Sequence, residues 1–269
     1  MKTTEVDHET GRKGLEQPNL PVITLLTDFG TADYFVGAVK GAILSVNPNV
    51  AIVDITHEIP AQDIEAGAFM LLAAYKTFPR GTIHVAVVDP GVGSARRPII
   101  VTANEQFFVG PDNGLFSYIY DRESSHQSFH VVEEKYFRLD PSSTFHGRDI
   151  FAPVAAALST GVPPQQFGPA INDEIRLPSL ETPLRIIHID HFGNCVTNIR
   201  REVFEAKSLS VNGRTITALR NFYGEAKPGE IFAIWGSAGF LEISVNGGSA
   251  AQILGAKRGD TILLGTDKR

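Results

Sequence analysis

The sequence predicts an α/β protein in two parts: an N-terminal α/β domain with a mainly parallel sheet, then a C-terminal antiparallel β-barrel domain. Strand-like and helix-like segments alternate before Pro178, which is typical of layered α/β folds. After Pro178 the segments are strand-like pieces joined by Gly, Asn and Asp turns, which favours a small antiparallel barrel or sandwich. We place the domains at residues 19–179 and 180–269, and we expect residues 1–18 to form a disordered tail.

The expected strands of the first domain are short apolar runs. "VITLLTDF" ends near an aspartate, as buried parallel strands often do. "AIVDITH" and "TIHVAVVD" are the second and third strands, and "RPIIVTANEQFFVGPDNG" indicates further strand and turn. Because helix patterns separate the first three strands, parallel pairing is the expected arrangement.

The expected helices have apolar positions at helical spacing. One face of the first helix consists of Val36, Val39, Ile43 and Val46. Asp63 and Glu65 begin the next helix, where acidic side chains suit the positive end of the helix dipole. Its inner face consists of Ile64, Ala68, Leu71, Leu72 and Tyr75. "DIFAPVAAALSTG" predicts a further helix that stops at Gly161.

The second domain has no convincing long helix pattern. Its strand-like pieces are "PLRIIHIDHFGNCVTNI", "LSVNGRTITAL", "GEIFAIWGSAGFLEISVN" and "DTILLG". The segment "LPSLETP" marks the expected boundary between the domains.

The composition limits the class of protein. The chain has 269 residues, 43% of them hydrophobic, and a formal net charge of −6, which suits a globular protein and argues against nucleic acid as its ligand. Its longest apolar runs are too short to span a bilayer, and its N-terminus lacks the apolar region of a secretory signal. Cys195 is the single cysteine, so an intramolecular disulfide is excluded. We therefore expect a cytoplasmic protein with no membrane partner.

The stretch "VVDPGVGSARRP" is the first candidate site. It lacks the lysine and Ser/Thr of a phosphate-binding P-loop, so a plain turn is one interpretation. However, Asp89 lies at the carboxyl end of a predicted parallel strand, and Asp28 has the same place on the first strand. Open α/β sheets bind ligands at that edge, where carboxylates commonly bind ribose hydroxyls.

"STFHGRD" is the second candidate. Asp149 could cap the following helix and His146 could be a plain loop residue. Alternatively, His146 transfers protons, because its ordinary pKa lies near neutrality.

A metal site is not expected. "HQSFH" would place His126 and His130 on one face of a helix, but it lacks the glutamate of the zincin motif. No cysteine pair exists, and Cys195 is better explained as a small buried residue than as a nucleophile.

"DHFGNCVTN" gathers Asp190, Asn194 and Asn198 around a glycine bend. A tight β-turn explains this composition, and so does a polar clamp for a zwitterionic ligand. "WGSAGFLEISVNGG" is also compatible with an ordinary hairpin.

Taken in order, these motifs resemble the S-adenosylmethionine hydrolases, also called hydroxide adenosyltransferases, which are relatives of the bacterial fluorinase and chlorinase. The matching stretches are "LLTDFGTADYFVGAVKG", "VDITHEIPAQDIEAGAFML", "HVAVVDPGVGSARRPI", "GPDNGLF", "TFHGRDIFAPVAA", "IDHFGNCVTNI" and "GSAGFLEISVNGGSAA". They are spread over nearly all of the chain beyond the tail. The resemblance implies an N-terminal α/β domain, a C-terminal β-barrel domain and a homotrimer with sites between subunits.

The resemblance also implies a reaction: water or hydroxide attacks C5′ of S-adenosylmethionine and gives adenosine and L-methionine. The hydrolase branch carries an Asp-Arg-His set, which matches Asp89, Arg96 and His146. Asp89 and His146 would orient the water and accept its proton, beside a guanidinium that stays charged. The leaving group is already a sulfonium, so no metal or other cofactor is expected.

By the same matching, Asp28 binds the ribose hydroxyls and Asp190 binds the methionine ammonium, with Asn194 and Ser237 near the amino-acid end. The residues matched to the rest of the substrate are Tyr223 against adenine, Val245 and Asn246 with their backbone near adenine, and Glu242. Where the halogenases have an arginine after the serine, this chain has Ala238, so the methionine carboxylate must be held differently.

Two other functions remain open from the sequence. A halide adenosyltransferase would use the same fold, but the Asp-Arg-His set argues against it. A nucleoside-binding module without turnover would keep Asp28, Asp190 and Tyr223 and would not need Arg96 together with His146.

Overall fold

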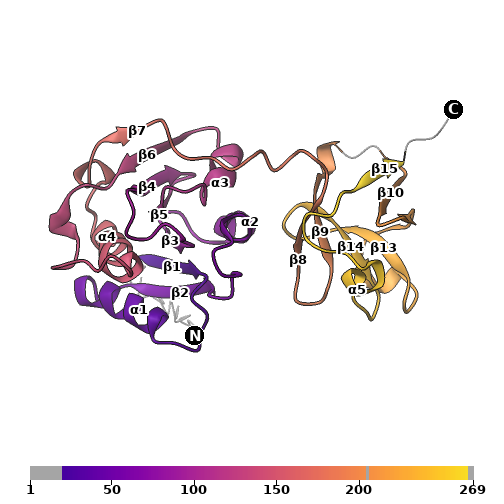
Figure 1. Cartoon of the computed structure of the whole chain (residues 1–269), viewed down its shortest axis with the longest axis horizontal. Helices are drawn as coiled ribbons and strands as arrows, with labels where there is room; N and C mark the ends of the chain where they lie inside the picture. The colour runs from indigo at the N-terminus through magenta and orange to yellow at the C-terminus, as the bar shows by residue number, and fades with distance from the viewer. Residues whose placement is uncertain (1–19, 204–205, 266–269) are drawn as a thin grey trace, which may run out of the picture.

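The computed structural model describes residues 20–203 and 206–265 (Figure 1). The expected tail, residues 1–18, lies outside the described residues. The helices are α1 (Phe35–Val46), α2 (Ile64–Ala74), α3 (Ser117–Arg122), α4 (Ala152–Ser159) and α5 (Ala250–Leu254). None of them is long and apolar enough to cross a bilayer.

The N-terminal part is built on one seven-stranded sheet, with the strand order β2-β1-β3-β5-β4-β6-β7. Its strands are β1 (Val22–Thr27), β2 (Ala51–Thr56), β3 (Ile83–Val87), β4 (Pro98–Ala103), β5 (Gln106–Pro111), β6 (His126–His130) and β7 (Ala170–Ile171). The first four strands of this order, β2, β1, β3 and β5, pair in parallel. The remaining strands, β4, β6 and β7, pair antiparallel to their neighbours. The predicted α/β class and mostly parallel sheet are therefore confirmed, with an antiparallel extension.

Helices cover both faces of this sheet. Successive strand residues point to opposite faces, so Leu25 packs in a core with α1 and α4, whereas Leu26 packs in a second core with α2 and α3. Val39 and Ile43 are buried on the inner face of α1, as predicted. The prediction is wrong for Val46, which is exposed because the helix ends there.

Among its described residues, the C-terminal part contains two open sheets. One has the order β12-β13-β14-β9-β8 and the other the order β11-β10-β15. Their strands are β8 (Ile186–Ile189), β9 (Cys195–Arg200), β10 (Ser208–Val211), β11 (Arg214–Ile216), β12 (Leu219–Arg220), β13 (Ile231–Trp235), β14 (Phe240–Val245) and β15 (Leu263–Gly265). Leu209 and Leu241, from different sheets, share one core.

The described residues do not confirm the closed antiparallel barrel that the sequence predicts. β12 pairs with β13 in parallel. Beside β8, Arg185 and Thr261 form only an isolated bridge, so this edge is not joined to the smaller sheet by a continuous ladder. The segment around Gly259, where φ is +93°, bends instead of extending as a strand.

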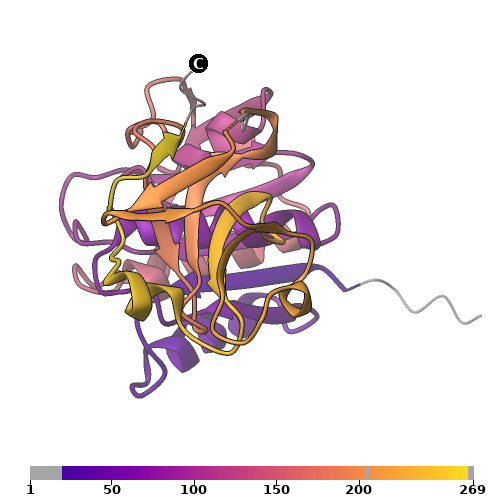
Figure 2. The ribbon, with the colours of Figure 1, turned by 90° about the vertical axis from the view of Figure 1, so that its right-hand side faces the viewer.

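Helix α2 is the element of the first part that faces the second. Figure 1 shows the two parts side by side, joined by one extended segment after β7, and Figure 2 shows the second part from its outer side, nearest the viewer. On α2, Phe69 packs between His188 of β8 and Phe240 of β14, with ring centroids 5.3 and 5.9 Å away. An apolar contact therefore joins the two parts.

The sheet brings two candidate residues to one edge. β1 and β3 are direct parallel neighbours, and Thr27 is in register with Val87. Asp28 follows the first strand directly and Asp89 follows the other after one further residue. The expectation that both aspartates leave the same edge of the sheet is confirmed.

A substitution on β5 tests the strand packing. Gly110 leaves no room for a side chain, because an added Cβ would lie 2.3 Å from the backbone oxygen of Ala86. We expect Gly110→Ala to lower the free energy of unfolding by about 1–3 kcal/mol, measured by urea denaturation. Gly37→Ala is the control, because nothing lies within 4 Å of that position in α1. If Gly110→Ala proved as stable as Gly37→Ala, β3 and β5 could not approach so closely.

Candidate active site

The loop that follows β3 folds back toward its own start. The backbone N–H groups of Val92 and Ser94 donate to the carbonyls of Asp89 and Gly91. Gly93 has a φ of +78°, and a Cβ there would lie 2.2 Å from the carbonyl oxygen of Ser143. Only glycine fits this close approach. The loop is therefore a tight turn, pressed against the segment that carries His146.

The turn places Arg96 against Asp89. The Arg96 Nε donates to both carboxylate oxygens of Asp89 at 3.0 and 2.9 Å, and Nη2 also binds the carboxylate. The side chains are only 8% and 5% exposed. The guanidinium also lies over the ring of Phe151, 5.1 Å from its centroid. A buried pair with this fork geometry is strongly oriented.

Arg96 also contacts His146. Its Nη2 lies 2.7 Å from Nδ1 of the imidazole. Because a guanidinium only donates, Nδ1 accepts, and the hydrogen of a neutral ring is on Nε2. Burial and then the Arg96 charge lower the pKa of His146, so the ring is neutral near pH 7. The residues expected to form one set are thus in contact.

Asp149 holds the His146 segment and is not a helix cap. Its buried carboxylate accepts from the backbone N–H of Ser142 at 2.9 Å and from Nε of Arg148 at 2.6 Å. Residues 147–151 form a π-helical turn, and α4 begins at Ala152 without a side-chain cap. The capping interpretation of Asp149 is therefore wrong.

A cavity of about 390 Å³ lies at this edge of the sheet. Asp28, Asp89 and His146 all line it. Its other lining residues include Phe29, Phe35, Gln62, Thr144 and Phe145. Sequence reasoning missed this aromatic wall, although Phe29 and Phe145 directly neighbour residues that it selected.

Gln62 orients Asp28. Its backbone N–H donates to Oδ2 of Asp28 at 2.8 Å. Gln62 has a φ of +64°, an uncommon conformation for a residue with a side chain. No local sequence signal identified this contact, since the two residues come from different loops.

A second cavity, of about 520 Å³, lies on the C-terminal part. Four predicted residues line it: Asn194, Tyr223, Val245 and Asn246. Phe192 also lines it and is 75% exposed. This cavity shares no lining residue with the cavity at Asp28.

Asp190 forms the tight turn that its sequence allowed. Its Oδ1 accepts from the backbone N–H groups of Phe192 and Asn194 at 2.9 and 2.8 Å. Its Oδ2 accepts from Nδ2 of Asn194 at 2.8 Å. Each carboxylate oxygen has two lone pairs, so the anion can still bind a cationic ligand.

Glu242 is the buried acid of this region. The hydroxyl of Tyr223 donates to its Oε2 at 3.4 Å. Burial first, and then the charge of Asp190, raise the pKa of Glu242. Its side chain occupies the space that a Cβ on Gly236 would need, which explains the glycine there.

Ser237 lies apart from both cavities. It lines a smaller cavity of about 270 Å³ between the two parts of the chain, together with Ala238. The cationic residues Lys76 and Arg122 line the same cavity. The structure therefore does not bring Ser237 into the cavity of Asn194 and Tyr223.

The histidines and the cysteine considered for a metal site lie in strands. His126 and His130 lie in strand β6 and not on a helix. No group of three or more potential metal ligands occurs within residues 20–203 and 206–265. Cys195 is buried in β9, and burial raises its pKa to about 11, which agrees with the prediction of a small buried residue.

Both parts of the chain match one family. Residues 23–168 match the SAM hydroxide adenosyltransferase N-terminal domain, and residues 184–263 match the SAM hydroxide adenosyltransferase C-terminal domain. A crystal structure of an uncharacterized conserved protein from Thermotoga maritima superposes with a TM-score of 0.85 at 35% identity, covering 89% of this chain and 98% of that one.

The relatives include hydrolases. The chain is 37% identical over 256 residues to the (R)-S-adenosyl-L-methionine hydrolase of Salinispora tropica, with 90% of this chain and 97% of that protein covered. It is 39% identical over 251 residues to the protein of that name from Methanocaldococcus jannaschii, covering 87% and 92%. A fluorinase from an Actinoplanes species is more distant, at 28% identity with 69% and 74% covered.

The contact between Arg96 and His146 makes a titration prediction. We expect the His146 ring to titrate below the usual value for histidine, with Nε2 carrying the hydrogen in the neutral form, as measured by ¹⁵N NMR. The stabilisation from this contact is thus present above the usual pKa and is lost as the pH falls through the lowered one. Arg96→Gln should move the midpoint upward. A midpoint at or above the usual value would contradict the contact.

Proposed function

The chain belongs to the SAM hydroxide adenosyltransferase family, and we propose that it hydrolyses S-adenosyl-L-methionine at C5′ to adenosine and L-methionine. The observation that carries the proposal is the contact of the buried Arg96 with both Asp89 and His146, which line one cavity. A binding module without turnover would not need a buried guanidinium between a carboxylate and an imidazole.

In the proposed reaction, the water oxygen bonds to C5′ while the C5′–S bond breaks. The electron pair of that bond goes to sulfur, which leaves as the neutral thioether of methionine. No acid is needed for this departure and no cofactor is required, so catalysis concerns the water. Holding the oxygen in line with C5′ and sulfur accounts for about 7–11 kcal/mol of the barrier.

The hydrogen-bond pattern refines the roles of the three residues. Nδ1 of His146 already accepts from Arg96, so the neutral ring presents Nε2–H and donates to the water oxygen. Asp89 has lone pairs left and takes the proton of the water. Arg96 favours hydroxide character by its permanent charge. We therefore propose a donor role for His146, in place of the proton-acceptor role expected from the sequence.

The substrate contacts that we propose use both parts of the chain. Asp28 accepts from both ribose hydroxyls, with Gln62 holding its carboxylate. The adenine lies against the half-exposed ring of Tyr223 and the backbone of Val245 and Asn246.

At the methionine end, Asp190 binds the ammonium beside Asn194. Glu242 adds a second acidic side chain near this ammonium. Ser237 lines a separate cavity within one chain, so its assignment to the amino-acid end rests on the family resemblance alone. Ala238 cannot replace an arginine, so we propose that the methionine carboxylate is held differently from the way the halogenases hold it.

We further propose a cytoplasmic homotrimer with each site between two subunits. The cavity at Asp28 and the cavity at Tyr223 share no residue within one chain, and each contains only part of the proposed contacts. Joining the first cavity of one subunit to the second cavity of its neighbour would bring Asp28, Asp89 and His146 to face Asn194 and Tyr223. The single buried Cys195 suits a reducing compartment.

Incubation with S-adenosylmethionine in ¹⁸O-labelled water tests the function. We expect chromatography to detect adenosine and methionine in equal amounts, with the label in the 5′-hydroxyl of adenosine. A product that forms only when chloride or fluoride is added would instead identify a halide adenosyltransferase. Tight adenosine binding without methionine release would support a binding module.

Substitutions test the shared water. We expect Asp89→Asn, Arg96→Lys and His146→Ala each to lower turnover by about 10²–10⁴-fold, with a smaller effect on adenosine affinity. Lysine should not rescue position 96, because an ammonium lacks the planar fork. Double variants should lose little more than the worse single variant. Strictly additive losses would refute one unit acting on one water.

Mixed oligomers test the location of the site. His146→Ala and Asp190→Ala inactivate different parts of the chain, so each homotrimer should be inactive. After co-expression in equal amounts, about a quarter of the sites should combine two intact parts and regain activity. Light scattering should give a trimer. A fully active monomer, or no recovery in the mixture, would rule out sites between subunits.

A further inference from the structure

We infer that Arg258, in the C-terminal part, is a positioning residue for the ribose carboxylate Asp28, and that it acts through Asp63 and Gln62. The inference rests on the proposed function, since it assigns Asp28 to the nucleoside. Nothing in the sequence patterns connected Arg258 to a site.

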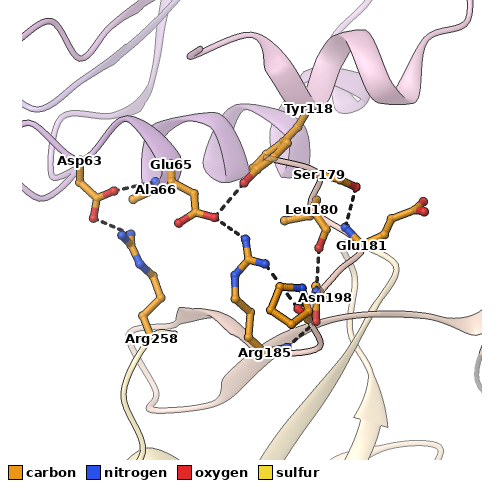
Figure 3. Close-up of polar contacts among 11 residues, drawn as sticks. Asp63, Glu65, Ala66, Tyr118, Ser179, Leu180, Glu181, Arg185, Asn198 and Arg258 are labelled. Carbon is orange, nitrogen blue, oxygen red and sulfur yellow. Dashed lines mark hydrogen bonds and ion pairs between the residues drawn. The ribbon is translucent and has the colours of Figure 1, made fainter. Parts of the chain in front are cut away.

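The first link joins the two parts of the chain. Nη1 of Arg258 lies 2.5 Å from Oδ2 of Asp63, at the start of α2 (Figure 3). The other carboxylate oxygen, Oδ1, accepts from the backbone N–H of Ala66 at 3.0 Å and caps the helix. Both oxygens of Asp63 are thus engaged, and its position is fixed from two sides.

The second link joins Asp63 to Asp28. Gln62 directly precedes Asp63, and its N–H donates to Oδ2 of Asp28 at 2.8 Å. Gln62 has a φ of +64°, which costs energy for a residue with a side chain and persists only under external restraint. The N–H of Asp63 donates to the carbonyl of Pro60 at 3.0 Å, and that of Ile64 to the carbonyl of Gln62 at 3.1 Å. Holding Asp63 therefore restrains the turn that orients Asp28.

The Arg258 end is itself anchored. The turn around it is closed by a bond from the N–H of Lys257 to Oδ2 of Asp260, at 2.9 Å. The N–H of Gly259 donates to the carbonyl of Ile186 in β8 at 2.8 Å. β8 leads into Asp190, so the backbone turn that carries Arg258 is fixed to the strand that precedes the proposed ammonium site.

The same helix provides a matched control. Two residues further along α2, Oε1 of Glu65 accepts from Nη2 of Arg185 at 2.6 Å and from the hydroxyl of Tyr118 at 2.9 Å (Figure 3). This pair also joins the two parts of the chain. Within the described residues, neither of its side chains forms a hydrogen bond or ion pair with Gln62 or Asp63, so its loss should weaken the junction without moving Asp28.

The two pairs should therefore differ in their effect on nucleoside binding. The side chains of Arg258 and Asp63 are 34% and 22% exposed, so the pair stabilises the fold little. Its loss frees the strained turn and lets the Asp28 carboxylate rotate away from the ribose. Turnover at saturating substrate should change little, because Arg96 and His146 lie on other loops.

The experiment compares Arg258→Gln, Asp63→Asn and Arg185→Gln in the full chain. Asparagine keeps the helix cap and removes only the charge, so Asp63→Asn is the second variant if Arg258→Gln fails to fold. Calorimetry with adenosine should give a dissociation constant raised about threefold to fivefold by either variant, as expected for an ion pair of this exposure. The double variant should be no worse than either single variant. Arg185→Gln should leave the constant unchanged while lowering the melting temperature similarly.

Equal losses of adenosine affinity in Arg258→Gln and Arg185→Gln would overturn the inference, because a general weakening of the junction would then explain both. Unchanged affinity in both Arg258→Gln and Asp63→Asn would overturn it too. A wild-type protein that binds adenosine but does not hydrolyse S-adenosylmethionine would refute the proposed function and leave this test intact.

Discussion

The buried ion pair of Arg96 and Asp89 is the interaction on which the candidate site depends. Removing both charges from water is costly, and the pair persists because the fork geometry places the guanidinium N–H donors against both carboxylate oxygens. The same guanidinium has a donor left for His146, so the loop that carries His146 packs against the loop that carries Arg96. Gly93 makes this approach possible, since any larger residue would collide with Ser143. Charge and steric fit therefore select one arrangement of the two loops.

Helix α2 has two distinct tasks at the junction of the chain. Its apolar surface, with Phe69 at the centre, supplies the buried area that holds the two parts together. Its acidic first turn binds two arginines, which contribute little stability but define one orientation. Acidic residues that suit the helix dipole are thus also the residues that connect the domains.

The separation of the two cavities follows from where each part of the chain has free polar groups. Carboxyl strand ends give the first cavity its carboxylates, whereas turns of the second part give an exposed aromatic surface around Phe192 and Tyr223. An exposed aromatic surface suits a flat heterocycle, and carboxylates suit hydroxyls. Neither surface alone matches a nucleoside joined to an amino acid, which is why we place the site between subunits.

The sequence by itself determined the α/β class, the buried strands and the shared edge of Asp28 and Asp89, because hydrophobic periodicity and the alternation of strands with helices along the chain are local properties. The resemblance supplied Arg96 and His146 as a set. Only the tertiary structure decided that Asp149 braces a loop, that Ser237 lies apart from Tyr223, and that Gln62 holds Asp28. These contacts join residues far apart along the chain, and local propensity carries no information about which loops meet. Only the tertiary structure also decided how the strands of the second part form sheets. Whether such sheets close into a barrel depends on pairing between distant edges and not on any single strand.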